Sequence, residues 1–272
     1  MSLHQNAVDV TVGIAFYSKC NPNDLRVAVE SVLAQTYPVE HIHLIQDGPI
    51  PPILDQLIQQ LRARDPRIEH LHIEKNMGLA YCLNRSILDT NSKYYARMDA
   101  DDYSHPDRLR RQIAYLEQHP SIDILGTWAL EYEEEPHEAG ALLKSVPLNQ
   151  HEIRRIFHYK APMIHASVVF RLTVFAEIGL YNISYRTDED NDLWVRAIRG
   201  GVGMANLPEP LYYIGTKGQA GRRADRRALY EEALNKCKLL TLSPKLNLLK
   251  MLSIAYRLLP ARVQSMIYRK LR

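Results

Sequence analysis

Strand-like and helix-like segments alternate along the first 100 residues, and this alternation limits the possible folds more than any other feature. Four apolar runs of strand length occur, at 10–16, 41–46, 68–74 and 94–98. Three segments with apolar residues at helical spacing lie between them, at 24–35, 53–64 and 79–89. Strand, helix and strand in this order predict βαβ crossovers. We therefore expect an α/β fold with a mostly parallel central sheet flanked by helices.

The pattern becomes less regular after residue 105. We expect a helix over about 106–119 with Pro106 in its first position, a strand at 167–170 and a helix over about 189–199. No internal repeat or low-complexity linker separates the two halves. We therefore predict one domain over residues 1–221, followed by a helical C-terminal region over 222–272.

The net charge of +3 is unevenly distributed. From residue 233 onward the chain has nine Lys or Arg and no acidic residue, so the rest of the chain is net acidic. A globally basic nucleic-acid-binding protein would not have this distribution. This distribution therefore argues against nucleic acid as a partner.

The sequence contains no signal for export or membrane insertion. The first residues, "MSLHQNAVDVTVGIAFYS", lack a basic segment followed by an apolar one, and no run of about 18 apolar residues occurs. The three cysteines are widely spaced without a C-x-x-C pair. We expect a cytoplasmic protein.

Three aspartates follow the predicted strand at 94–98. They are Asp99, Asp101 and Asp102 of "RMDADDY". In such sheets ligands bind at the carboxyl ends of the strands, where Asp47 also lies. An Asp-x-Asp pair is typical of sites for hard divalent cations, so we predict that Asp101, with Asp99 beside it, binds Mg²⁺ or Mn²⁺. An acidic surface turn is the alternative.

A second acidic group occurs in "RTDEDNDLWVRA" (186–197). Helix capping offers one explanation, with Thr187 as N-cap and Asp190 three residues later. Asp190 also lies one helical turn before Leu193 and Trp194. Apolar surroundings raise the pKa of a carboxyl group and make it a better base, so Asp190 is our candidate general base.

Other motifs carry less information. In "HIH" (41–43) and "HLH" (70–72), strand alternation places both histidines of a pair on one face, and we expect solvent-exposed residues rather than metal ligands. There is no P-loop and no G-x-G-x-x-G after the first strand, so the sequence does not support ATP hydrolysis or dinucleotide redox chemistry.

Six blocks of the sequence resemble family 2 glycosyltransferases in order and spacing over roughly residues 10–215. The blocks are "VTVGIAFYS", "AVESVLAQTYPVEHIHLIQDGP", "EKNMGLAYCLNRSI", "ARMDADDYSHPDRLRRQ", "IHASVVFR" and "DEDNDLWVRA". They most resemble the bacterial branch that builds exopolysaccharide, capsule and lipopolysaccharide O-antigen, including the amylovoran-biosynthesis type. The resemblance implies a GT-A fold, a Rossmann-like architecture with a nucleotide-sugar half over about 8–105 and an acceptor half over about 106–221.

The resemblance also implies a reaction and a set of site residues. The reaction is inverting transfer of a sugar from a nucleoside diphosphate donor, usually UDP, to an acceptor hydroxyl. The residues implied for the nucleotide pocket are Tyr17 against the base, Asp47 at the uracil, and Lys75, Asn76 and Gly78. Those implied at the ribose, diphosphate and metal are Arg97, Asp99 and Asp101. Asp190 matches the family's catalytic base.

One family feature is missing from this sequence. Some relatives carry a His after the last strand that reaches the metal or diphosphate, whereas "YYIGTKGQAGRRADRR" contains none. As a hypothesis, Lys217, Arg222 or Arg223 neutralises the diphosphate instead. His165 of "MIHAS" matches a position near the acceptor, and a structural hydrogen bond is the alternative role.

The C-terminal region has a helical pattern of apolar residues, namely Leu248, Leu252, Ala255 and Leu259. Basic residues interrupt it, as in helices that lie in an anionic membrane interface. A helix packed on the domain is the other interpretation. The resemblance favours the inner face of the cytoplasmic membrane and a lipid-linked or oligosaccharide acceptor.

Three other functions compete with a glycosyltransferase. A sugar-1-phosphate nucleotidyltransferase has a Gly- and Arg-rich loop after its first strand, where this chain has "FYSKCNPND". A haloacid-dehalogenase-type phosphatase has its nucleophilic Asp there, where this chain has Tyr17 and Ser18. A non-catalytic, membrane-peripheral protein with the same fold is the third.

Overall fold

The computed structural model describes residues 9–136, 140–216 and 226–259, together with positions 263 and 266. The strands of this part are β1 (Val10–Phe16), β2 (His41–Asp47), β3 (Ile68–Ile73), β4 (Tyr94–Asp99), β5 (Tyr103–Ser104), β6 (Ile124–Tyr132), β7 (Leu142–Lys144), β8 (Val169–Arg171) and β9 (Met204–Gly215). The helices are α1 (Pro22–Leu33), α2 (Pro52–Arg64), α3 (Leu79–Leu88), α4 (Arg108–Gln118), α5 (Gln150–Ile156), α6 (Val174–Ile178), α7 (Glu189–Gly200), α8 (Arg226–Lys238) and α9 (Pro244–Arg257).

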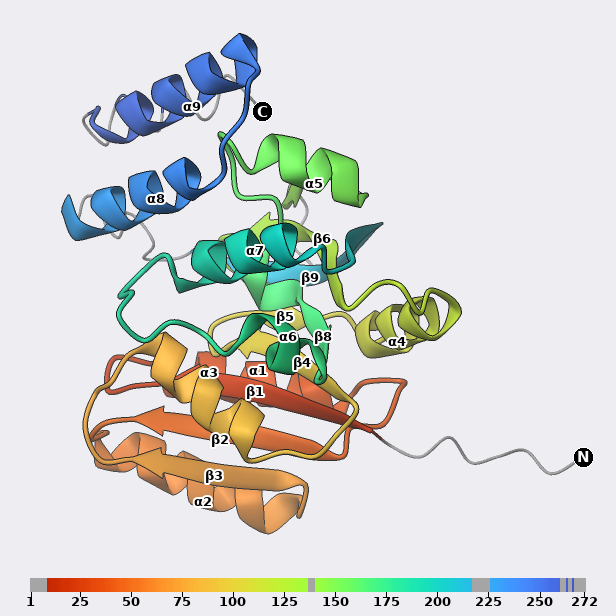
Figure 1. Ribbon diagram of the computed structural model, residues 1–272. Helices are drawn as coiled ribbons and strands as arrows, with labels where there is room; N and C mark the ends of the chain where they lie inside the picture. The colour runs from red at the N-terminus through yellow and green to blue at the C-terminus, as the bar shows by residue number, and fades with distance from the viewer. Residues whose placement is uncertain (1–8, 137–139, 217–225, 260–262, 264–265, 267–272) are drawn as a thin grey trace, which may run out of the picture.

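The N-terminal half is the predicted parallel sheet. Strands β3, β2, β1 and β4 lie side by side in this order, and all three pairings are parallel. Helix α3 covers one face, and α1 and α2 cover the other (Figure 1). Because both faces are covered, β1 and most of β2 are buried along their length. His43, which we expected to be exposed, is 1% exposed beneath α3.

The second half of the sheet is mixed. Strand β8 joins β4 in antiparallel orientation, β6 joins β8 in the same way, and β6 and β9 are parallel. The two- and three-residue strands β5 and β7 add antiparallel pairs at β9 and β6. The prediction of a mostly parallel sheet therefore holds for the N-terminal half, whereas the sheet as a whole is mixed. Parallel neighbours need long crossover connections, and the chain between β6 and β9, which includes α5, α6 and α7, provides one.

The two helices that flank the acidic groups differ slightly from the predictions. Helix α4 begins at Arg108, with Asp107 as its N-cap, so the prediction that Pro106 occupies the first helical position is wrong. The carbonyl of Pro106 instead accepts the backbone N–H of Thr36 at 2.8 Å. Helix α7 begins at Glu189 as expected and ends at Gly200, and the φ of +76° at the following Gly201 is the left-handed conformation common after a helix.

The C-terminal helices α8 and α9 stack beyond α7, on the side away from the parallel sheet (Figure 1). Lys238 of α8 binds Asp192 of α7 at 2.6 Å. The expected boundary between residues 221 and 222 lies outside the described residues. None of the helices within those residues is long and apolar enough to cross a membrane.

Gly203 allows β6 and β9 to pair closely. A Cβ at this position would lie 1.7 Å from the carbonyl oxygen of Ser121. We therefore expect Gly203→Ala to lower the free energy of unfolding by about 1–3 kcal/mol, measured by urea denaturation. Gly200→Ala is the matched control, because its Cβ would meet only ordinary contacts beyond 3.4 Å. Equal stability of the two variants would contradict this account.

Candidate active site

Acidic side chains converge where β4 ends. Arg97, which is 4% exposed, donates two hydrogen bonds to Asp99, at 2.6 Å from Nη2 to Oδ1 and 2.9 Å from Nη1 to Oδ2. One carboxylate oxygen each from Asp99, Asp101 and Asp102 lies within 4.8 Å of the other two. An all-carboxylate set of this size fits a hard divalent cation such as Mg²⁺ or Mn²⁺.

Asp102 belongs to this cluster, although the sequence singled out only Asp99 and Asp101 as ligands. It is 3% exposed, and its Oδ1 accepts the backbone N–H of Gly215 at the end of β9 at 3.0 Å. Burial and the nearby Asp99 and Asp101 raise the pKa of Asp102 well above its usual value. The third Asp of "DADD" was the sequence signal for a further ligand. Its burial could not be predicted, because its partner Gly215 lies 113 residues away in sequence.

A second group of predicted residues meets at the end of β2. The two carboxylate oxygens of Asp47 accept the backbone N–H groups of Met77 at 2.6 Å and Gly78 at 3.0 Å. Asp47 therefore holds the turn that enters α3. Gly78 is the N-cap of α3 with a φ of +89°, which explains why glycine stands there. The side chain of Asn76 donates to the carbonyl of Asp47 at 3.3 Å.

The remaining nucleotide-pocket candidates lie at the same edge of the sheet. Tyr17 follows β1 and is 38% exposed. Lys75 is exposed in the turn between β3 and α3. Since β1, β2 and β3 are parallel, their carboxyl ends bring Tyr17, Asp47 and Lys75 to one rim.

The first turn of α7 holds the second acidic group, Asp188, Glu189 and Asp190. Asp188 and Glu189 are buried, and Asp190 is partly exposed. Burial and the neighbouring Glu189 raise the pKa of Asp190 to about 7, and the charge of Arg97 opposes this rise. The expected increase in the pKa of Asp190 is confirmed. Arg97 therefore acts on both acidic groups, one in each half of the chain.

The capping interpretation of this turn is wrong in detail. Asp188, not Thr187, is the N-cap, and the Thr187 hydroxyl donates to Glu231 of α8 at 3.0 Å. The carboxylate of Asp188 accepts the side-chain amides of Asn191 at 2.8 Å and Asn235 at 2.7 Å. Burial and the nearby Asp190 raise the pKa of Asp188 to about 7. Sequence analysis missed this role because Asn235 is on another helix.

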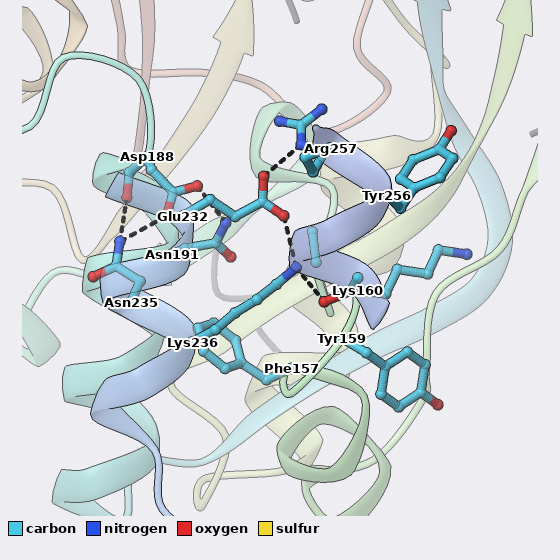
Figure 2. A pocket seen from close by; sticks show the side chains of 12 residues that line it. Phe157, Tyr159, Lys160, Asp188, Asn191, Glu232, Asn235, Lys236, Tyr256 and Arg257 are labelled. Carbon is cyan, nitrogen blue, oxygen red and sulfur yellow. Dashed lines mark hydrogen bonds and ion pairs between the residues drawn. The ribbon is translucent and has the colours of Figure 1, made fainter. Parts of the chain in front are cut away.

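A cavity of about 330 Å³ lies beside this turn, between α7, α8, α9 and residues 157–161 (Figure 2). Its lining residues include Tyr159, Lys160, Asp188, Asn191, Ser253 and Tyr256. Glu232 of α8 forms part of the wall and accepts hydrogen bonds from Lys236 and Arg257, both at 2.6 Å. The Arg257–Glu232 pair joins α9 to α8, and Lys236 of α8 also donates to the Ser253 hydroxyl of α9 at 2.9 Å, so the C-terminal helices help to form the cavity.

His165 has a structural hydrogen bond, the alternative that the sequence left open. Its Nε2 lies 2.8 Å from the Tyr181 hydroxyl, and its ring contacts Trp194 edge-on at 5.9 Å between ring centroids. Burial and the charge of Arg97 lower the pKa of His165 well below its usual value, so the ring is neutral. Lys217, Arg222 and Arg223, our candidates for the diphosphate, lie outside the described residues.

Comparison with known proteins identifies the family. The sequence pattern of glycosyl transferase family 2 matches residues 11–179. The chain belongs to glycosyl transferase family 2. It is 33% identical to the amylovoran biosynthesis glycosyltransferase AmsE of Erwinia amylovora over 75% of each chain. It is 27% identical to the Escherichia coli enzyme named UDP-Gal:alpha-D-GlcNAc-diphosphoundecaprenol beta-1,3-galactosyltransferase, over 76% of this chain and 71% of that one.

Solved structures support the fold assignment. The mannosyltransferase PcManGT of Pyrobaculum calidifontis, solved with GDP-Man and Mn²⁺, superimposes with a TM-score of 0.65 over 93% of this chain and 70% of its own, at 14% identity. The predicted GT-A fold is therefore confirmed. Membership of family 2 identifies the chain as a glycosyltransferase and argues against the nucleotidyltransferase and phosphatase alternatives.

The raised pKa of Asp190 predicts a stability effect. Its value of about 7, against 3.8 for an ordinary Asp, makes the folded state bind more protons than the unfolded state between about pH 4 and 7. Stability therefore falls as pH rises through this interval and stays reduced above it. In EDTA, Asp190→Asn should raise the free energy of unfolding at pH 8 by on the order of 1–3 kcal/mol and change it little at pH 4.

The matched control for this experiment is Asp192→Asn on the same helix. Asp192 is paired with Arg196 at 2.9 Å and Lys238 at 2.6 Å, so removing its charge should destabilise the fold at pH 8. Urea denaturation of both variants at pH 4 and pH 8 measures the difference. An Asp190→Asn variant that is no more stable than the native protein at pH 8 would contradict the buried-charge account.

Proposed function

We propose that this protein is an inverting, metal-dependent glycosyltransferase that transfers a sugar from a nucleoside diphosphate donor, with UDP as the expected nucleotide. The observation that supports this most directly is that the charge of Arg97 acts on two acidic groups at once. Asp99, Asp101 and Asp102 converge like a cation site, whereas Asp190, beside Glu189 in the first turn of α7, is partly exposed and has a raised pKa. The printed name of the E. coli relative, which includes UDP-Gal, supports the choice of nucleotide.

The donor would lie along the carboxyl edge of β1 to β4. Tyr17 would contact the base, Asp47 the uracil, and Lys75, Asn76 and Gly78 the rest of the nucleotide. Asp47 already binds two backbone amides, so its contact with the uracil would use the remaining lone pairs of its oxygens. Arg97 would hold Asp99 in position beside the ribose and diphosphate.

Asp99 and Asp101 would bind Mg²⁺ or Mn²⁺, and the neighbour solved with Mn²⁺ supports a divalent ion. A divalent cation in this position stabilises the negative charge that develops on the departing diphosphate. Arg97 holds the carboxylate of Asp99 at this edge through two hydrogen bonds.

Asp190 would be the base that takes the proton of the acceptor hydroxyl. A base is most effective when its pKa lies near the working pH, and the pKa of Asp190 is about 7. Its Oδ1 accepts the backbone N–H of Asn191 at 2.8 Å, which fixes the carboxylate at the start of α7. A single displacement by the activated hydroxyl inverts the configuration at the anomeric carbon, so no enzyme nucleophile is needed.

We place the acceptor on the side of the cavity beside α7, because Asn191 follows the proposed base directly and lines that cavity. Tyr159 and Tyr256 offer aromatic surface, and Asn191 and Ser253 offer polar groups, which together suit a sugar. The printed name of the E. coli relative gives a sugar on diphosphoundecaprenol as that enzyme's acceptor. A lipid-linked sugar of bacterial surface polysaccharide synthesis is therefore our proposed acceptor class.

Helix α9 supports a position at the membrane surface. Two of its basic residues face inward, where Lys250 donates to the Leu239 carbonyl at 2.8 Å and Arg257 binds Glu232. Its outward stripe is apolar, with exposed fractions of 60% at Leu248, 64% at Met251 and 68% at Leu258. An apolar stripe beside Lys245 suits an anionic lipid surface. We therefore propose peripheral contact with the inner face of the cytoplasmic membrane, with α9 between the lipid and the acceptor cavity.

Donor turnover tests the proposed chemistry. UDP-, dTDP- and GDP-sugars are screened for hydrolysis with Mg²⁺ or Mn²⁺, and nucleotide binding is measured by calorimetry. We expect Asp190→Asn to lower turnover by about 10²–10⁴-fold while retaining nucleotide binding. Asp101→Asn should lose the metal-dependent part of that binding. Asp55→Asn, an exposed acid on α2, is the control and should change neither quantity.

Unchanged turnover in both Asp101→Asn and Asp190→Asn would overturn this mechanism. Absence of turnover in the native protein with all donors and metals would favour the non-catalytic alternative.

Liposome binding tests the membrane contact. We expect deletion of residues 245–272 to release the protein from vesicles containing anionic phospholipid, because each basic residue near the surface contributes about 1 kcal/mol and the apolar stripe contributes more. The double variant Met251→Glu/Leu258→Glu should be released in the same way without truncation. Ile53→Glu, at a 60% exposed position of α2, is the matched control and should still bind. Equal sedimentation of all these variants with vesicles would rule out α9 as the contact.

A further inference from the structure

A second group of potential metal ligands lies away from the carboxylate site. His41 and His43 are on one face of β2, and Glu69 of β3 is the register partner of His43. One ligand atom of each residue lies within 4.8 Å of the others. Among the residues that the structure describes, only this cluster and that of Asp99, Asp101 and Asp102 bring three such groups together.

The two clusters are separated along the sheet. His41 is in register with Thr11 at the start of β1, and Asp99 is in register with Ala15. Four residues of strand correspond to about 13 Å at roughly 3.3 Å per residue. The histidine cluster lies towards the amino ends of β2 and β3, whereas the carboxylates lie at the carboxyl end of β4. A ligand at one cluster therefore does not contact the other.

The spacing suits a small transition-metal ion. The Glu69 carboxylate lies between the two imidazoles, with Oε1 2.5 Å from Nδ1 of His41 and Oε2 3.9 Å from Nε2 of His43. Tetrahedral ligands that are 2.0–2.1 Å from Zn²⁺ are separated by about 3.3 Å. The two contacts are to different oxygens of Glu69, so binding through one oxygen needs a rotation of the carboxylate, and the ligand atoms already lie within 4.8 Å of one another. The side chains of His41 and Glu69 are 37% and 43% exposed and have room for this adjustment.

Neighbouring groups orient both imidazoles. The Nδ1 of His43 lies 2.9 Å from the Ser86 hydroxyl of α3, which turns Nε2 towards Glu69. On His41, Nε2 faces Glu40 at 3.8 Å while Nδ1 faces Glu69. The Ser92 hydroxyl in turn donates to Glu40 at 2.9 Å. Metal-binding histidines commonly have such a partner on the nitrogen that does not bind the metal.

We propose that His41, His43 and Glu69 bind a divalent transition-metal ion of the Zn²⁺ type. Two imidazoles and one carboxylate favour such an ion, whereas the all-carboxylate cluster favours Mg²⁺ or Mn²⁺. Because β3 is the edge strand of the sheet, the ion joins this edge to β2. This site is independent of the proposed transferase reaction.

The chain contains its own matched control. His70 and His72 repeat the H-x-H pattern on β3, and the Nε2 of His70 lies 2.9 Å from the side-chain oxygen of Gln46. The pair contributes to neither three-ligand cluster of the described residues. A general affinity of strand histidines for zinc would therefore appear equally at both pairs.

The test is a Zn²⁺ titration of the untagged full chain by calorimetry, with excess Mg²⁺ present to occupy the carboxylate site. We expect one Zn²⁺ per chain and a rise in melting temperature on binding. His41→Ala and Glu69→Gln should each weaken Zn²⁺ binding at least about tenfold. The double variant His70→Ala/His72→Ala should bind as the native chain does, and so should Asp99→Asn/Asp101→Asn.

Both informative substitutions are at partly exposed side chains, so they test the site without removing the buried His43. Circular dichroism confirms that each variant is folded before titration. We take roughly 100 µM Zn²⁺ as the limit for a specific site. If the native chain binds no Zn²⁺ at this concentration, the proposal is overturned. Affinities of His41→Ala and Glu69→Gln within twofold of the native value would overturn it as well.

Discussion

The guanidinium of Arg97 is the charge on which the arrangement of the site depends. Its side chain binds Asp99 through two hydrogen bonds, and its backbone N–H donates to the Val168 carbonyl at 2.9 Å. Its own carbonyl accepts a hydrogen bond from the buried Arg108 at 2.9 Å. Arg97 therefore joins the end of β4 to α4 and to Val168, the residue before β8, and its charge also reaches Glu189, Asp190 and His165. Without this cation, carboxyl groups from both halves of the chain would repel each other in a poorly solvated region.

The sequence predicted what depends on local patterns. The parallel strands and their helices were found within two residues because apolar periodicity and Pro or Gly positions determine them locally. The short strands β5 and β7 carry too few residues to show any period, and although a strand was expected at 167–170, the antiparallel pairing of β8 arises from tertiary contacts. The site follows the same rule. Asp99, Asp101 and Asp190 are recognisable by their motifs, whereas the burial of Asp102 and Asp188 depends on Gly215 and Asn235, which are distant in sequence.

Helix α9 illustrates a different limit of sequence analysis. The helical pattern identified its apolar stripe, but a pattern does not say which face is covered. Glu232 of α8 decides this, because it is largely covered in the seam between the two helices and pairs with Arg257 of α9 as well as with Lys236 of its own helix. The pair with Arg257 turns this polar side of α9 inward and leaves the apolar residues outside. The same ion pairs form a wall of the cavity, so one electrostatic requirement determines both the outer surface and the inner lining.

The contacts between α7 and α8 also explain why the pKa of Asp190 stays near 7. Asp192, on the inner side of α7, is neutralised by Lys238 and Arg196. Asp188, one turn earlier, has the neutral amides of Asn191 and Asn235 as its partners. A cation in place of Asn235 would favour the ionised form of Asp188 and, at close range, would also lower the pKa of Asp190. Amide donors satisfy the buried oxygens of Asp188 without adding charge. The unfavourable free energy of burying these ionised carboxylates is therefore only partly compensated. The uncompensated part holds the pKa of Asp190 near 7.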